Sequence, residues 1–342
     1  MRGVLRVLPV GLRGWIRASL IGLGLPGLLG GALWWMTTMP ERSSVGELPP
    51  LSALEEEIEG RLQGHVRALA ADIGERNVFR PDRLERAQAF LKTTLTDLGL
   101  HVEPQCFESR GVPVCNLEVE QRGRSRPDEI VVLGAHYDSV IGSPGANDNA
   151  TGVAAVIELG RLLAARDLPR TVRLVLFVNE EPPFYLTGDM GSLRYAGRAR
   201  ERGDHIVAML SLETLGCFSD EEGSQQYPFP FSFFYPSRGN FIGFVGNLSS
   251  RRLVRRVVGS FRRHSTFPSE ALAAPGWITG VGWSDHWSFW QHGYPGVMVT
   301  DTALFRYGAY HTAQDTPDRV RYAHLARVVA GLEKVVVDLA SE

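Results

Sequence analysis

Apolar positions along the chain fall into two kinds of run, which predict strands that alternate with helices. Four runs are nearly continuous stretches of aliphatic residues, as the buried strands of a parallel sheet are. They lie at residues 129–136, 171–181, 206–216 and 293–302. Other runs repeat their apolar residues at helical spacing. These predicted helices are 52–71, 81–98, 152–166, 193–203, 253–264 and 322–339.

Strands separated by helices are typical of an α/β fold. We expect three layers, with a mostly parallel central sheet flanked by helices. Residues 37–50 are polar and contain prolines, so they predict a linker. No change of composition follows, and residues 51–342 are expected to form one catalytic-size domain.

The N-terminal segment has a different pattern. Residues 1–17 carry four arginines and no acidic residue, and residues 18–36 carry no charge. A helix of that length would roughly cross a bilayer, with Trp34 and Trp35 at the interface and the basic end in the cytoplasm. We therefore expect a transmembrane anchor at 18–36 after a cytoplasmic N-terminus. A secretory signal cleaved near residues 30–32 is the alternative. Both predict an extracytoplasmic (periplasmic or extracellular) domain.

Composition and charge narrow the possible partners only slightly. The 342 residues are 44% hydrophobic and 22% charged, which is ordinary for a globular protein. The net charge of −2 gives no general attraction to nucleic acid, so no nucleic-acid partner is expected.

The chain contains three cysteines. Cys106 and Cys115 lie in QCFESRGVPVC, two short β-like runs that could face each other across a hairpin. An extracytoplasmic location permits a disulfide there. Two unpaired thiols are an equally open alternative, and no role is assigned to Cys217.

Carboxylates and imidazoles gather where the predicted strands end. They are His136 and Asp138 after the first strand, Asp148 in the following loop, Glu180 and Glu181 closing the second strand, Glu213 in the third, and His311 after the last. The carboxyl ends of parallel strands form the ligand-binding edge of such sheets. Taken alone, Asp148 has a simpler explanation as a turn residue, and His136 as a strand-end histidine.

Taken together, these side chains predict a metal site. Crowded carboxylates repel one another, and cations offset that repulsion. A mixed set of histidine, aspartate and glutamate ligands fits zinc or another borderline divalent metal. Two such metals can share one water and lower its pKa toward neutrality.

Six motifs of the chain resemble those of a known family. They are GAHYDS (134–139), GANDNATG (145–152), NEEPP (179–183), SLETLG (211–216), SDHWSFW (284–290) and YHTAQDTPD (310–318). In order and spacing they resemble the two-zinc exopeptidases of clan MH, the bacterial aminopeptidase and glutaminyl-cyclase-like group. The resemblance covers about residues 51–339 and implies the zinc-exopeptidase fold.

The resemblance implies a set of metal ligands. Asp148 is expected to bridge two metal ions, which are expected to be zinc. His136 and Glu213 are expected to complete one site, and Glu181 and His311 the other. The Glu213 position varies between Asp and Glu in this family.

The resemblance also implies roles for residues that bind no metal. Glu180 is expected to be the general base that activates the metal-bridging water. Tyr310 is expected to stabilise the transition state. Asp138 is expected to orient His136, and Asp285 to be an acidic residue near the site.

These expectations predict a membrane-anchored aminopeptidase that hydrolyses the N-terminal peptide bond of peptides with a free N-terminus. One alternative is a glutaminyl cyclase, an aminoacyltransferase with a single zinc. Another is a non-catalytic ectodomain of the same fold. Aromatic loops at 183–191, 227–236 and 276–290 favour an apolar side-chain pocket, although packing against the sheet would also explain them.

Overall fold

The computed structural model describes residues 26–342, which form two separate units divided between Thr38 and Met39. Residues 26–37 are helical. The predicted membrane anchor, 18–36, lies partly outside the described residues. Among the residues that are described, no helix is both long and apolar enough to span a membrane.

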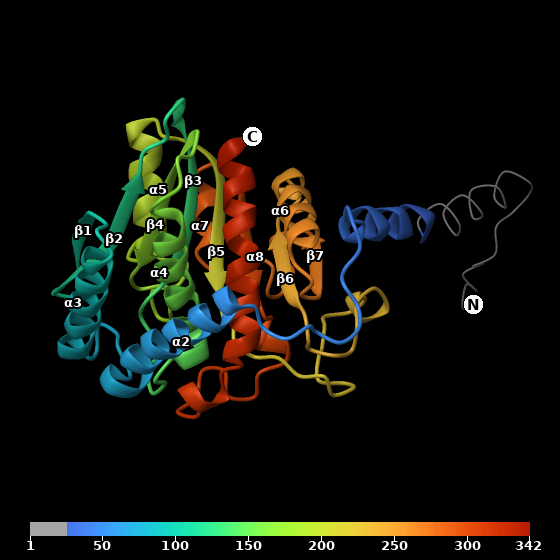
Figure 1. The fold of residues 1–342 in the computed structure, drawn as a ribbon, viewed down its shortest axis with the longest axis horizontal. Helices are drawn as coiled ribbons and strands as arrows, with labels where there is room; N and C mark the ends of the chain where they lie inside the picture. The colour runs from blue at the N-terminus through green and yellow to red at the C-terminus, as the bar shows by residue number, and fades with distance from the viewer. Residues whose placement is uncertain (1–25) are drawn as a thin grey trace, which may run out of the picture. The chain divides into compact units, whose positions relative to one another are not determined.

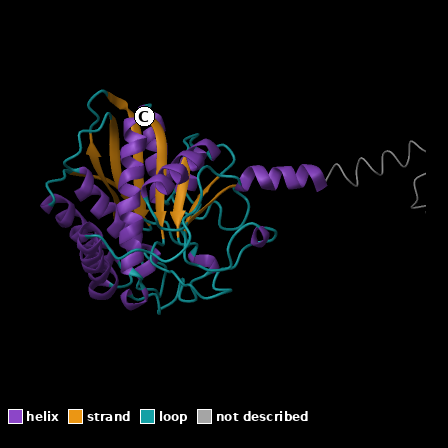
Figure 2. Cartoon of the chain, turned by 45° about the vertical axis from the view of Figure 1, so that its right-hand side comes forward, coloured by secondary structure: helices purple, strands orange, loops and turns teal. Residues whose placement is uncertain are grey.

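The second unit is built on one sheet of eight strands in the order β1-β2-β4-β3-β5-β8-β6-β7 (Figures 1 and 2). The strands are β1 Val102–Ser109, β2 Val112–Gln121, β3 Arg126–His136, β4 Arg170–Phe177, β5 His205–Glu213, β6 Ile242–Gly246, β7 Ser269–Ala273 and β8 Gly296–Thr300. The four central strands β4, β3, β5 and β8 are parallel. Both flanks join them antiparallel, through β2 and through β6. The predicted parallel arrangement is therefore confirmed for the centre of the sheet, and the antiparallel flanks make the sheet as a whole mixed.

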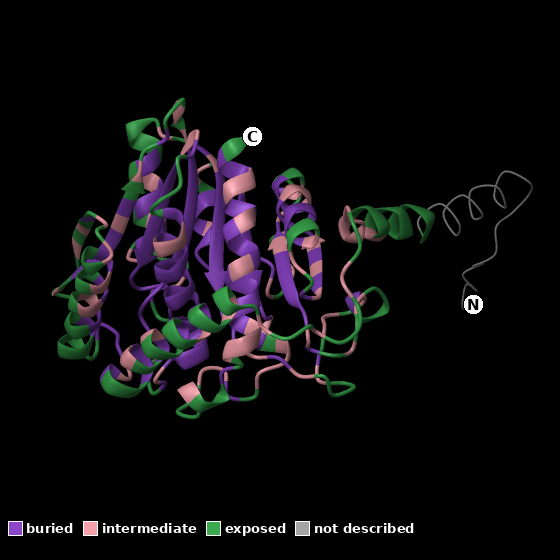
Figure 3. Ribbon diagram, in the orientation of Figure 1, coloured by how far each residue is buried: buried purple, intermediate pink, exposed green. Residues whose placement is uncertain are grey.

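Helices cover both faces of the sheet. They are α2 Ala53–Arg67, α3 Pro81–Asp97, α4 Thr151–Leu163, α5 Gly191–Arg202, α6 Arg251–His264, α7 His286–Gln291 and α8 Tyr322–Ser341. Alternate residues of β3 pack against the helices on opposite faces of the sheet, because successive side chains of a strand point to opposite sides. Val131 and Leu133 belong to the core under α2, α4 and α8, whereas Ile130 and Val132 pack with α5 and α7. Buried strands lie between partly exposed helices in Figure 3.

Local sequence explains where the first helices begin. Ser52 caps α2 in a capping box with Glu55, which satisfies backbone N–H groups at the helix start. Pro81 begins α3, where its missing N–H costs nothing. The predicted linker, 37–50, contains neither helix nor strand after residue 37, but it packs on the domain at both Pro40 and Pro49. Arg262 donates to the carbonyl oxygen of Pro40 (3.1 Å), and Arg327 donates to that of Pro49.

Cys106 and Cys115 form a disulfide across the β1–β2 hairpin, where they are direct cross-strand partners. The prediction of a hairpin is therefore confirmed, and the open question of pairing is decided in favour of the disulfide.

Two predictions about elements were wrong. The strand predicted at 171–181 ends at Phe177, so Glu180 and Glu181 lie in the loop beyond it. The sequence pattern also missed β6, β7 and α7, which have only five or six residues each. Runs this short do not complete enough periods to stand out.

Candidate active site

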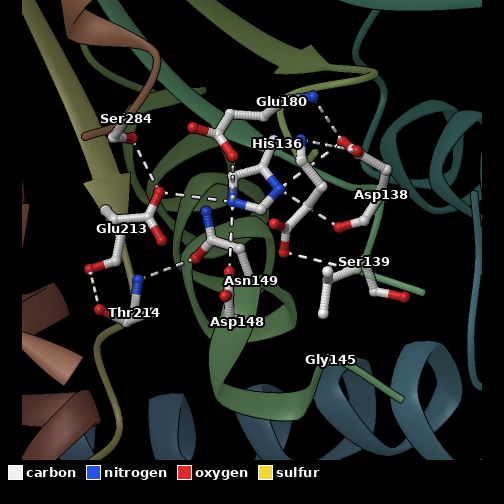
Figure 4. Close-up of polar contacts among 12 residues, drawn as sticks. His136, Asp138, Ser139, Gly145, Asp148, Asn149, Glu180, Glu213, Thr214 and Ser284 are labelled. Carbon is white, nitrogen blue, oxygen red and sulfur yellow. Dashed lines mark hydrogen bonds and ion pairs between the residues drawn. The ribbon is translucent and has the colours of Figure 1, made fainter. Parts of the chain in front are cut away.

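Asp148 lies in the loop between β3 and α4, which Asn149 ties to the end of β5. The Asn149 amide donates to the carbonyl oxygen of Leu212 (2.9 Å), and its oxygen accepts the N–H of Thr214 (3.0 Å). The peptide bond between Asp148 and Asn149 is cis. These contacts place Asp148 beside Glu213, the last residue of β5 (Figure 4).

Asp315 holds the same loop from another side. Its two carboxylate oxygens accept the backbone N–H groups of Asn147 (2.8 Å) and Asp148 (3.0 Å). Asp315 was not among the predicted site residues, although it lies four residues after His311 in the motif YHTAQDTPD. Its position in a Gly/Thr/Asp/Pro loop beside a predicted ligand was the available signal.

Arg76 is a second residue that supports the site and was not predicted from the sequence. Its fully buried guanidinium donates to the carbonyl oxygens of Tyr137 (2.6 Å), Pro144 (2.6 Å) and Gly145 (2.9 Å). Gly145 has φ +63°, and a Cβ there would lie 2.5 Å from the carbonyl oxygen of Asp148. Only glycine fits, so Arg76 and Gly145 together set the path of the loop.

The five predicted metal ligands meet as two groups that share Asp148. In the first, Nε2 of His136 lies 3.3 Å from Oδ1 of Asp148 and 3.4 Å from Oε2 of Glu213. In the second, Nε2 of His311 lies 3.0 Å from Oδ2 of Asp148 and 3.3 Å from Oε2 of Glu181. Within each group the ligand atoms all lie within 4.8 Å of one another. Each group could hold one metal ion.

The chemistry of these atoms fits a divalent cation. Among the described residues, Nε2 of His136 and both carboxylate oxygens of Asp148 are buried without a hydrogen bond. Unsatisfied buried polar atoms are costly, and metal coordination would satisfy them. Burial raises the pKa of Glu181 well above its usual range, and the negative charge of Asp148 raises it further. A cation would remove that repulsion, and imidazole with carboxylate is a ligand set that zinc accepts.

Asp138 organises the neighbours of the ligands. Its carbonyl oxygen lies 3.2 Å from Nδ1 of His136, which places the proton on that nitrogen and leaves Nε2 to face Asp148. Its carboxylate oxygen is farther from Nδ1, at 3.6 Å. The two carboxylate oxygens instead accept the backbone N–H groups of Glu180 and Glu181, both at 3.1 Å. Asp138 thus contacts His136 through its main chain, while its side chain fixes the loop of the two glutamates.

Glu180 faces the same space without belonging to either ligand group. Its Oε2 lies 3.8 Å from Nε2 of His136. Burial raises its pKa well above the usual range of a glutamate. Glu213 has a partner of its own, because Ser284 donates a hydrogen bond of 2.7 Å to its Oε2.

Comparison with known proteins identifies the family. Residues 116–336 match peptidase family M28. The chain belongs to peptidase family M28. It is therefore a peptidase, and the predicted family is confirmed. The uncharacterised protein YfbL of Escherichia coli is 36% identical over 282 residues, which are 80% of this chain and 85% of that protein. A probable aminopeptidase of Saccharomyces cerevisiae is 26% identical over 242 residues, 65% of this chain and 56% of that protein.

Solved structures confirm the M28 fold. A zinc aminopeptidase from Bacillus subtilis superposes with a TM-score of 0.64 at 14% identity, covering 83% of this chain and 95% of that one. A glutaminyl cyclase from Bacteroides thetaiotaomicron gives 0.61 at 17% identity, covering 85% of this chain and 99% of that one. At these identities the likeness concerns the fold alone.

Two further predicted residues of the M28 site lie next to the ligands. The ring of Tyr310 stacks on His311, with their centroids 3.8 Å apart. Asp285 is fully buried at the start of α7, and burial raises its pKa to about 7. The charges of His136 and Glu213 also act on that pKa, so Asp285 lies close to the first ligand group.

A pocket opens beside this M28 site, with Glu213 and Tyr310 in its wall. Its empty volume is about 850 Å³, including the mouth. The predicted aromatic loops 227–236 and 276–290 contribute to the lining, among them Tyr227, Phe231 and Trp283. The predicted loop 183–191 contributes no lining residue. It contacts one of the lining loops instead, because the hydroxyl of Tyr185 donates to the carbonyl oxygen of Gly282 at 2.7 Å.

Proposed function

We propose that this protein is a metal-dependent aminopeptidase that removes N-terminal residues from peptides, with zinc as its metal. The observation that carries the proposal is the pair of ligand groups that share Asp148, with Glu180 beside them and the pocket next to them. The yeast relative, which is a probable aminopeptidase, supports it.

The ligand groups would hold two ions, His136 and Glu213 with Asp148 in one, Glu181 and His311 with Asp148 in the other. When bound, divalent ions lower the pKa of a water molecule and polarise the substrate carbonyl.

Glu180 is the group best placed to move a proton. It stands at the edge of the ligand groups without entering either, so its carboxylate can accept a proton and later return it to the leaving amine. In the absence of cations, burial raises its pKa, and nearby positive charge lowers it again. Asp138 keeps Glu180 in place through the hydrogen bond to its backbone N–H. The Tyr310 hydroxyl is proposed to stabilise the oxyanion.

The test is hydrolysis of aminoacyl amides by the zinc-supplemented protein and by Glu180→Gln. Glutamine keeps the shape but cannot accept the proton, so we expect kcat to fall at least about a hundredfold. Zinc content should stay the same, because Glu180 belongs to neither ligand group. Unchanged hydrolysis in Glu180→Gln would remove Glu180 from the mechanism.

Glutaminyl cyclase activity is the second candidate function, because this chain shares its fold with a solved glutaminyl cyclase. It needs one zinc, whereas this chain has a complete second group in Asp148, Glu181 and His311. Assaying ring closure of peptides with an N-terminal glutamine beside release of free amino acids separates the two activities. Cyclisation without release would favour the second candidate.

We further propose that residues 18–36 anchor the chain in a membrane and that the peptidase domain faces the extracytoplasmic side. The Cys106–Cys115 disulfide supports this location, because such bonds persist in oxidising compartments. Protease accessibility of the domain in intact cells or spheroplasts, followed by membrane fractionation, tests both parts. A domain protected from protease in spheroplasts would contradict the location.

A further inference from the structure

The pocket beside the metal ligands has a floor made by one face of β8, β6 and β7. Phe244, Ala273 and Val299 of these strands point into the core on the α6 and α8 side. Residues one position away in each strand line the pocket, on the opposite face. Among residues 26–342, no α-helix contributes to the lining of this pocket; the loops 227–236 and 276–283 lie over the sheet face instead.

One row of paired residues crosses this floor from the metal site to the edge of the sheet. Glu213 pairs with Thr300, Thr300 with Gly243, and Gly243 with Glu270. Paired residues of neighbouring strands share a face, and the strands are about 4.8 Å apart. Three steps therefore place the Glu270 backbone about 14 Å from that of Glu213. Gly243 adds no side chain between them, so the floor stays open along the row.

Glu270 is a charged group at the far end of an otherwise largely apolar pocket. Within the described part of the chain, its carboxylate accepts no hydrogen bond, and its one ion-pair contact is to Nη2 of Arg262 at 3.8 Å. That distance is too long for a hydrogen bond. The Arg262 guanidinium instead donates to the oxygens of Pro40, Glu41 and Ser269. Arg262 therefore leaves the hydrogen-bonding capacity of Glu270 unused.

We propose that Glu270 is a specificity-determining residue that selects peptides whose N-terminal residue is lysine or arginine; the inference rests on the proposed aminopeptidase function. Such a side chain has an apolar stem for the aromatic wall and a cationic end for the carboxylate. A lysine or arginine side chain extends about 6–7 Å from its Cα, which suits a carboxylate that reaches back from the far end of the row.

The charges that face Glu270 are compatible with this role. Burial raises its pKa to about 7, and Arg262 partly offsets the rise. Tyr227 and Tyr235 also face it, and burial raises both of their pKa values, so these phenols stay neutral. A cationic substrate group would supply the positive charge that a carboxylate in this apolar setting lacks.

The test compares L-lysine and L-norleucine 4-nitroanilides, whose side chains share a four-carbon chain, whereas only lysine carries the terminal ammonium group. The zinc-supplemented wild type is expected to favour lysine in kcat/KM. In Glu270→Gln the lysine-to-norleucine ratio should fall about tenfold or more, with the norleucine value changed less than about threefold. Glu270→Leu should show the same loss. Glu221→Gln, at an exposed position of the neighbouring loop, is the matched control and should leave the ratio unchanged.

The outcomes distinguish this inference from the proposed function. If wild type prefers norleucine, or if Glu270→Gln keeps the wild-type ratio, the specificity role is wrong while aminopeptidase activity stands. If neither substrate is hydrolysed, the proposed function is wrong. Calorimetric binding of L-lysinamide and L-norleucinamide then tests Glu270 alone. Tighter binding of lysinamide that Glu270→Gln abolishes supports the role, and equal binding of the two amides refutes it.

Discussion

Replacing Arg76 by methionine is expected to destabilise the protein and to weaken its metal affinity together. Methionine keeps the apolar stem but removes the donors to the carbonyl oxygens of Tyr137, Pro144 and Gly145. An unsatisfied buried carbonyl costs about 1–3 kcal/mol, and partial hydration of the vacated space recovers some of the loss. We therefore expect the free energy of unfolding to fall by about 3–5 kcal/mol.

Thermal unfolding and zinc titration measure the two effects. For a domain of this size, about 3–5 kcal/mol corresponds to a fall in Tm of about 5–8 °C. Because the same loop carries Asp148, zinc should bind at least about tenfold more weakly. Arg86→Met is the matched control, since Arg86 is exposed and donates one bond of 3.3 Å to the carbonyl oxygen of Asp72. If the Arg76 and Arg86 variants unfold at the same temperature and bind zinc equally well, the account of the loop is wrong.

Three further predictions concern the metals, the hairpin and the pocket. His311→Ala should bind one zinc per chain where wild type binds two, because the group of His136, Asp148 and Glu213 stays complete. Metal analysis measures the zinc content, and two zinc ions in the variant would contradict the assignment of His311. Replacing Cys106 and Cys115 by alanine should lower the free energy of unfolding by about 2–3 kcal/mol, because the disulfide no longer restricts the entropy of a short loop in the unfolded chain. Urea denaturation measures this change, and an unchanged midpoint would refute it. The ratio of kcat/KM for lysine to that for norleucine should rise between pH 6 and 8. Burial raises the pKa of Glu270 to about 7, and only the ionised carboxylate attracts a cation. A ratio that does not change with pH would contradict the proposed role of Glu270.

The ligands could be predicted from sequence because they follow strands that the hydrophobic pattern makes visible. His136 and Glu213 are the last residues of β3 and β5, so the register of a parallel sheet brings them together. The family resemblance added the roles, which spacing alone does not supply. Glu181 was placed correctly in space although its strand ends at Phe177, because the loop beyond stays at the same edge.

The residues that hold the ligands in place were harder to predict. Arg76 stands alone between two helices, and nothing in its neighbours reveals that its guanidinium is buried against a loop about 70 residues away. The pocket was hard to predict for a similar reason. Its floor depends on the pairing of β6 and β7, which are too short to predict, so the position of Glu270 opposite Gly243 appears only in three dimensions.

The hydrogen bonds of Asp315 tie the two ends of the metal site into one piece. Asp315 is in the same short segment as His311. It accepts a hydrogen bond from the backbone N–H of Asp148, the residue common to both ligand groups. An ion that orders His311 and Asp148 also orders one of the three ligands of the neighbouring group before a second ion arrives. The second ion then binds to a site whose entropy cost is partly met, so the two should load with positive cooperativity. The chain would then be found mostly with no zinc or with two zinc ions, and it would change from one state to the other over a narrow range of zinc concentration.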